Sequence, residues 1–128
     1  MQNDNTKLKT RNIDTSKRVF LLALRVIKLV DLLPKDTTSQ IIGKQLLRSA
    51  TSVGANVVEA KGASSRKDFT NFFSYALKSA NETIFWIELL KDSNKARGID
   101  LLPLLGEVKE VANILASSIL TLKGRKAS

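Results

Sequence analysis

The side chains that most enzymes use for catalysis or metal binding are scarce in this sequence. Its 128 residues include no Cys and no His, so the thiolate nucleophile, the usual general base and the commonest metal ligand are all missing. Ser64-x-x-Lys67 has the spacing of a serine nucleophile with a lysine base, but it stands where a loop meets the start of a predicted helix. The overlapping pattern Ser65-x-x-Asp68 explains these serines as helix-capping residues instead.

Two other patterns could suggest chemistry but lack the residues that would complete it. Gly43 and Gly54 lie within a predicted helix rather than before one, which argues against a phosphate-binding loop. Glu59 and Glu82 could form a pair of carboxylates, yet no His and no set of metal ligands accompanies them. The sequence therefore predicts a protein that is not an enzyme and that has no catalytic residues, no metal site and no cofactor.

Basic side chains are the remaining candidates for a binding function. Lys and Arg number 21 against 12 Asp and Glu, which gives a formal net charge of +9. This surplus favours nucleic acid as the partner, with an anionic membrane as the second candidate, although many solvated surfaces are also basic. Residues 1–18 carry five basic and two acidic side chains, and residues 123–128 carry three basic and none acidic. We expect both ends to be flexible basic arms that either aid solubility or bind phosphate.

The other basic residues come as pairs on helix surfaces and as a cluster near one predicted loop. This arrangement suits phosphates, because base readout or strand stacking would need planar or aromatic side chains grouped with the cations. We expect weakly sequence-selective binding to RNA or DNA that falls steeply with salt. In the competing interpretation the charge is a solubility device and Arg48 is an internal ion-pair partner, for example to Glu82. The residues predicted to contact nucleic acid are Arg18, Arg25, Lys28, Lys44, Arg48, Lys61, Arg66 and Lys67.

Four segments with the apolar spacing of amphipathic helices must position these side chains. The first ends before Pro34, and the others begin at Thr37-x-x-Gln40, Ser65-x-x-Asp68 and Asp100, which are typical capping sequences. The predicted helices span residues 16–33, 37–60, 65–90 and 100–123. The fold class is all-α: an antiparallel up-down-up-down four-helix bundle over residues 16–123, between a flexible basic arm at 1–15 and a basic tail at 124–128.

The segment RSATSVGANVVEA, residues 48–60, is rich in poor helix formers but is still predicted to be helical. A strand-turn-strand reading would place a short hairpin between long helical patterns, which is disfavoured. Steps of 100° per residue put the apolar and small residues on one arc that faces the core. The core residues predicted for this helix are Ile42, Leu46, Ser49, Ala50, Val53, Val57 and Ala60. For the fourth helix they are Leu101, Leu104, Leu105, Val108, Ala112, Leu115 and Ile119.

The first three helices have more apolar surface than one small bundle can bury. Aromatic side chains outside the core stripe suit a protein interface, so we expect a homo-oligomer. The alternative is that these aromatics pack over neighbouring helices within one bundle. The predicted interface residues are Gly54, Val58, Tyr75, Phe85, Trp86 and Leu89.

The N-terminal sequence MQNDNTKLKT lacks the apolar stretch of a secretory signal. The longest uncharged apolar run nearby, residues 19–24, is too short to span a bilayer. The expected location is the cytoplasm, without a membrane partner.

A sequence resemblance adds to this interpretation. The segment QLLRSATSVGANVVEA, followed by SRKDF and LKSANETIFWIELL, resembles the four-helix-bundle family of 23S ribosomal RNA intervening-sequence proteins over residues 19–122. The chain is similar, more generally, to the accessory variability determinant of diversity-generating retroelements. The residues that carry the resemblance are Gln45, Arg48, Ser49, Ser52, Asn56, Glu59, Ser79 and Glu82.

The resemblance implies a homopentameric, barrel-like assembly without catalytic activity. The retroelement branch implies a basic protein that binds RNA and a reverse transcriptase. The intervening-sequence branch implies no agreed molecular function, so a structural or protein-interaction module is the alternative. The presence of a reverse-transcriptase gene beside the coding gene would distinguish the two branches.

Overall fold

The computed structural model describes residues 4–127, with side chains for residues 15–124. It contains four helices, α1 (Asp4–Leu32), α2 (Thr37–Lys61), α3 (Arg66–Asp92) and α4 (Leu102–Ala127), and no strand lies within residues 4–127. The predicted all-α class with four helices is therefore confirmed.

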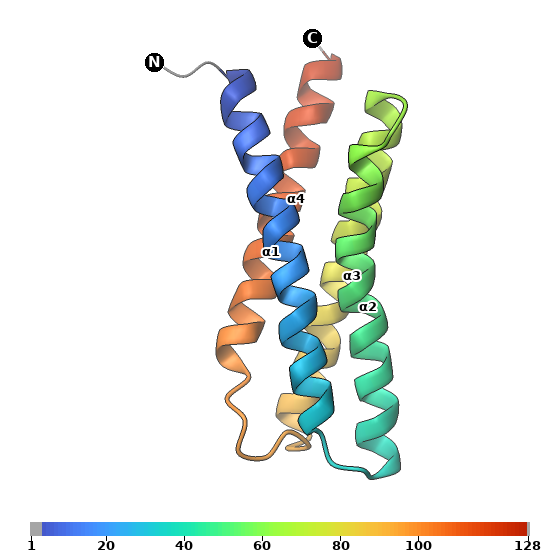
Figure 1. Ribbon diagram of the computed structural model, residues 1–128, viewed down its shortest axis with the longest axis vertical. Coiled ribbons are helices and arrows are strands. Elements are labelled where there is room, and N and C mark those ends of the chain that lie inside the picture. The colour runs from blue at the N-terminus through green and yellow to red at the C-terminus, as the bar shows by residue number, and fades with distance from the viewer. Residues whose placement is uncertain (1–3, 128) are drawn as a thin grey trace.

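The helices lie side by side, and their connections gather at two ends (Figure 1). The turn between α2 and α3 lies at the same end as the beginning of α1 and the end of α4. We call this the turn end. The connections from α1 to α2 and from α3 to α4 lie at the opposite end, which we call the loop end. Contacts join α1 to α2, α2 to α3, α3 to α4 and α1 to α4, so each helix packs against two neighbours.

Short polar side chains begin three of the helices. Asp36 is the N-cap of α2: its carboxylate accepts hydrogen bonds from the backbone N–H and the hydroxyl of Ser39, both at 2.9 Å. The cap is thus one residue before the Thr37 that the capping pattern indicated. Ser65 caps α3 as predicted, accepting from the backbone N–H of Asp68 at 3.1 Å. The Asp100 carboxylate accepts from the first backbone N–H of α4, at 3.1 Å.

Two helices extend beyond the predicted bundle. The helix α1 begins at Asp4, whereas residues 1–15 were expected to form a flexible arm, and α4 continues to Ala127 through the expected tail. Residues 1–3 and 128 lie outside the described residues. Residues 4–15 contain no Gly or Pro, the two residue types that most disfavour a helix interior. A basic composition was therefore a poor guide to where the helices end.

The core consists of the apolar stripes of all four helices. Every core residue predicted for the second and the fourth helix is buried, although Leu101 lies just before the start of α4. Residues 48–60 are helical, as predicted, and do not form a hairpin. On α2 the glycines allow α1 to approach closely. A Cβ at Gly43 would lie 3.1 Å from the Leu33 side chain, and a Cβ at Gly54 would lie 3.7 Å from the Val19 carbonyl oxygen.

Candidate nucleic-acid interface and assembly faces

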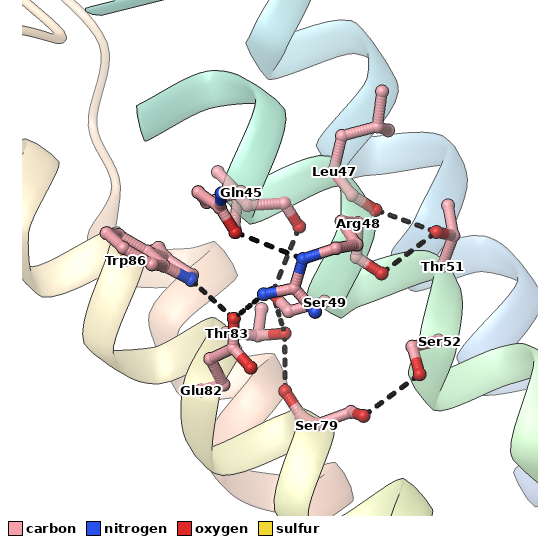
Figure 2. Close-up of polar contacts among 11 residues, drawn as sticks. Gln45, Leu47, Arg48, Ser49, Thr51, Ser52, Ser79, Glu82, Thr83 and Trp86 are labelled. Atoms are coloured by element: carbon pink, nitrogen blue, oxygen red, sulfur yellow. Dashed lines mark hydrogen bonds and ion pairs between the residues drawn. The ribbon is translucent and has the colours of Figure 1, made fainter. Parts of the chain in front are cut away.

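A row of hydroxyl groups joins α2 to α3 (Figure 2). The hydroxyl oxygens of the buried residues Ser49 and Thr83 lie 2.9 Å apart, and those of Ser52 and Ser79 lie 3.0 Å apart. The Thr83 hydroxyl also lies 2.8 Å from the Ser79 carbonyl oxygen. The Ser49 hydroxyl lies 3.1 Å from the Leu46 carbonyl oxygen. Small side chains therefore bring the two helices close, and each buried hydroxyl still has an acceptor.

An ion pair lies on the outer side of this contact. The Arg48 guanidinium of α2 pairs with the Glu82 carboxylate of α3, and its Nε donates to the Gln45 side-chain oxygen at 3.0 Å (Figure 2). The same Glu82 oxygen accepts a hydrogen bond from the Trp86 indole N–H at 2.9 Å. The competing interpretation of Arg48, as an internal partner of Glu82, is thus confirmed.

A second arginine of the predicted nucleic-acid set is also engaged within the bundle. Arg18 of α1 donates to both carboxylate oxygens of Glu107 of α4, from Nε at 3.1 Å and from Nη2 at 2.7 Å. This two-point geometry is the strongest form of a guanidinium–carboxylate contact. Arg18 and Arg48 therefore contribute less unbalanced charge to the surface than the sequence suggested.

The other six predicted residues remain open to an external anion. Each side chain is exposed, and none forms an ion pair within the part of the chain whose side chains are described. Arg25 and Lys28 lie on α1 and Lys44 on α2, in the half of the bundle nearer the loop end. The remaining three, Lys61, Arg66 and Lys67, lie at the turn end.

The structure adds Lys123 to the cluster at the turn end. A cavity of about 430 Å³ lies between the start of α3 and the end of α4. The described residues that line it are Arg66, Lys67, Thr70, Asn71, Leu122 and Lys123. Sequence analysis placed Lys123 only in a basic end segment, because nothing in one sequence tells which helix ends lie side by side.

Apolar side chains also lie exposed along the outer side of the α1–α2 pair. Phe20 is 63% exposed, and Leu24 and Ile27 follow it at the four- and seven-residue spacing that puts side chains on one helix strip. Val58 of α2 is 62% exposed and lies one helical turn after Gly54, which packs against Val19 of α1. We call Phe20, Leu24, Ile27 and Val58 the α1–α2 face. Of these, sequence analysis assigned only Val58 to an interface; the periodic spacing of the other three, opposite the core stripe of α1, was the available signal.

A second apolar surface lies on the outer side of the α2–α3 pair. The exposed side chains there are Ile41, Tyr75, Phe85 and Leu89. Along α3, the Glu82 carboxylate that pairs with Arg48 lies between Tyr75 and Phe85. We call these four residues the α2–α3 face. It includes three of the predicted interface residues, Tyr75, Phe85 and Leu89.

Gly54 and Trp86, also predicted interface residues, are half-buried within the bundle. Gly54 lies against Val19 of α1. Trp86 donates to Glu82, and its ring meets Phe85 edge to face with centroids 4.8 Å apart. Trp86 therefore packs beneath the exposed side chains of the α2–α3 face, and its substitution would disturb the fold as well as this face.

The described residues contain neither a membrane-spanning helix nor a cluster of metal ligands. No helix among them is both long enough and apolar enough to cross a membrane. No group of three or more Asp or Glu side chains within that same part of the chain could hold a metal ion.

Comparison with known proteins gives consistent matches. Residues 11–117 match the family described as 23S rRNA-intervening sequence protein. The chain is similar to a crystal structure of a protein with unknown function from the S23 ribosomal protein family of Bacteroides thetaiotaomicron. That comparison has a TM-score of 0.77 and 34% sequence identity, and it covers 85% of this chain and 97% of the other. No curated protein matches the chain.

Proposed function

This chain belongs to the 23S rRNA-intervening sequence protein family, and on that premise we propose that it is a non-enzymatic protein that binds RNA or DNA as a homo-oligomer. The proposal depends chiefly on one observation: six of the eight predicted cations are exposed and have no carboxylate partner among the side chains that the structure describes. Each such cation that meets a phosphate releases a condensed counterion, which favours binding.

The arrangement of the cations favours contacts to the phosphate backbone. Lys61, Arg66, Lys67 and Lys123 lie around a turn and a helix end rather than along one exposed helix strip that could enter a groove. The nearby aromatic ring of Phe69 is half-buried and stacks on Phe73, with ring centroids 4.6 Å apart, so it is not available to stack on a nucleic-acid base. We therefore expect little sequence selectivity.

The proposed assembly is a closed ring. The α1–α2 face and the α2–α3 face are two different apolar surfaces on one chain, and two unlike faces that bind each other generate a head-to-tail assembly. Such contacts close into a ring when the rotation between neighbours permits it. Five copies is the number that the family resemblance implies.

The resemblance also implies a reverse transcriptase as protein partner, which would bind the assembly together with RNA. The alternative, a structural or protein-interaction module without nucleic acid, has one observation in its favour. Arg18 and Arg48 hold carboxylates of their own chain, as expected where charge serves folding.

A filter-binding titration tests the proposal. We expect the full chain to bind a structured RNA and a DNA duplex at low salt, with similar affinities for unrelated sequences. The logarithm of the affinity should fall linearly with the logarithm of salt concentration, with a slope of about 0.7 to 0.9 for each phosphate contacted. If the chain binds neither the RNA nor the DNA at about 50 mM salt, the proposal is overturned and the protein-interaction module is favoured.

A further inference from the structure

We propose that the cavity between the start of α3 and the end of α4 is a discrete phosphate site, in which Arg66, Lys67 and Lys123 hold one phosphate group. The inference deepens the proposed function, on which it rests for nucleic acid as the source of the phosphate. The anion chemistry of the site itself can be tested without nucleic acid.

The shape of the site comes from two helices that are distant in sequence. Arg66 and Lys67 are the first two residues of α3, and Lys123 lies on the last turns of α4. All three line one cavity of about 430 Å³, large enough for a phosphate group with an attached sugar. A cation from each helix can therefore approach the same anion from different sides.

The charges around the cavity are unbalanced. Among residues 15–124, whose side chains are described, no carboxylate lines it, and none of the three cations forms an ion pair. The acidic side chain nearest in sequence, Asp68, accepts a hydrogen bond from the Ser64 hydroxyl at 2.8 Å. Like charges that share one cavity repel each other, so a bound dianion would relieve the repulsion.

The position of the two α3 cations adds to this imbalance. A helix N-terminus carries partial positive charge, which disfavours Arg and Lys in the first turn. Residues placed against a local preference without a compensating contact are characteristic of functional surfaces. An anion in the cavity would supply the missing contact for Arg66 and Lys67.

The donors in the cavity suit a phosphate oxyanion. A guanidinium presents a planar fork that matches two oxygens of a phosphate, and each ammonium adds a point charge with three donors. The Asn71 side chain is exposed and can donate from its amide. The Thr70 hydroxyl already donates to the Arg66 carbonyl oxygen at 2.8 Å, so it contributes no hydrogen to the anion.

Calorimetric titration with inorganic pyrophosphate, at constant ionic strength in chloride, tests the site. The test variant carries Arg66→Gln, Lys67→Gln and Lys123→Gln. The matched control carries Lys35→Gln, Arg97→Gln and Lys109→Gln, which remove one Arg and two Lys from exposed positions in the loop-end half of the bundle. Both variants lose the same formal charge.

We expect the unmodified chain and the control to bind one pyrophosphate per chain with similar affinity. The test variant should bind pyrophosphate at least about tenfold more weakly, because the loss of a single charge-assisted hydrogen bond lowers an affinity by roughly tenfold. Equal binding by the two variants, or no binding by the unmodified chain, would overturn the inference. If the triple variant loses helicity by circular dichroism, Lys123→Gln alone decides: an affinity equal to that of the control overturns the inference, and a weaker one supports it.

The same variants, titrated with a structured RNA, identify the source of the phosphate. A larger loss of RNA affinity in the test variant than in the control supports nucleic acid as the ligand of this site. If the unmodified chain binds pyrophosphate but no nucleic acid, the site stands with a free phosphate compound as its ligand, and the proposed function fails.

Discussion

The α1–α2 face and the α2–α3 face differ in what lies at their centres. Among the described residues, the first combines Phe20, Leu24, Ile27 and Val58 with no ion pair between its two helices. The second surrounds the Arg48–Glu82 pair and the Trp86 indole that donates to it. An apolar surface supplies binding energy without direction, whereas a fixed ion pair adds a geometric requirement. The proposed head-to-tail ring would bring these two unlike faces together.

Substitution on the α1–α2 face should have the largest effect. Phe20→Asp with Leu24→Asp places two carboxylates where the proposed ring buries apolar side chains, and an interface anchor commonly contributes about 2 kcal/mol or more. We expect a monomer by multi-angle light scattering, with helical content retained because both residues are exposed in the single chain. The matched control is Leu102→Asp with Leu120→Asp, on exposed α4 positions, which should assemble normally. An unchanged oligomer in the Phe20/Leu24 variant would remove the α1–α2 face from the assembly.

Mixing two defective variants distinguishes a head-to-tail contact from a symmetric one. A chain with Phe85→Asp and Leu89→Asp lacks a working α2–α3 face but keeps its α1–α2 face. Mixed with the Phe20/Leu24 variant, it should form a heterodimer through the one intact face of each chain, since neither can extend further. Light scattering should therefore show dimers in the mixture and monomers in each separate sample. Monomers in the mixture would contradict the pairing of unlike faces.

The ion pair at the centre of the α2–α3 face should matter more in the assembly than in the single chain. Glu82→Ala leaves Arg48 without its carboxylate and the Trp86 indole N–H without its acceptor. The loss of the ion pair itself costs at most about 1 kcal/mol of folding free energy because the pair is partly solvated. If the ring buries the pair, the same change should weaken association by about 2 kcal/mol, and the double change Arg48→Ala with Glu82→Ala should restore part of it. Chemical unfolding of the monomeric Phe20/Leu24 variant and sedimentation of the assembly measure the two quantities. An association free energy left unchanged by Glu82→Ala would place the pair outside the contact.

The smallest effect is expected at Asp36, at the loop end and outside both faces. Hydrogen bonds from the backbone N–H and hydroxyl of Ser39, followed by attraction to the Lys95 ammonium, lower the pKa of this carboxyl from its usual 3.8. Because the folded-state pKa is lowered, the ionised cap stabilises the fold above pH 3.8, and the stabilisation is lost as the pH falls through the folded-state pKa.

Thermal unfolding tests this cap. Asp36→Ala should melt slightly below the unmodified chain at neutral pH, and the difference should narrow below pH 3.8. Asp36→Asn serves as the control, since its amide oxygen can still cap the helix but does not titrate near this pH. An oligomer that dissociates on Asp36→Ala would show that the assembly extends beyond the two faces.

Much of the fold could be predicted because helix periodicity is a local property of the sequence. The buried stripes of α2 and α4 follow from 100° steps along the chain, even where Ser49 and Gly54 lower the helix propensity. The beginning of α1 could not be predicted in the same way. A polar helix without a core stripe lacks the periodic signal that distinguishes it from a flexible arm.

The candidate sites were less predictable because they depend on which side chains meet across helices. Arg18 and Arg48 are of a residue type that commonly binds phosphate, but each pairs with a carboxylate far away in the sequence. Glu107 lies 89 residues from Arg18, and Glu82 lies 34 residues from Arg48. The sequence suggested the Arg48 pair only as an alternative, and the Arg18 pair not at all. Lys123 joins Arg66 and Lys67 only through the packing of α4 beside α3.

The beginning of α1, the end of α4 and the α2–α3 turn all lie at the turn end of the bundle (Figure 1). This arrangement affects how strongly an assembly would bind a long nucleic acid. Both apolar faces run along the length of the helices, so a ring built through them would carry all its turn ends on one rim. A long nucleic acid that touches one copy would then find the next sites at a high effective concentration, and contacts that are individually weak would combine into strong avidity. Breaking the ring should therefore weaken binding to long RNA far more than binding to pyrophosphate, although no cation has been altered.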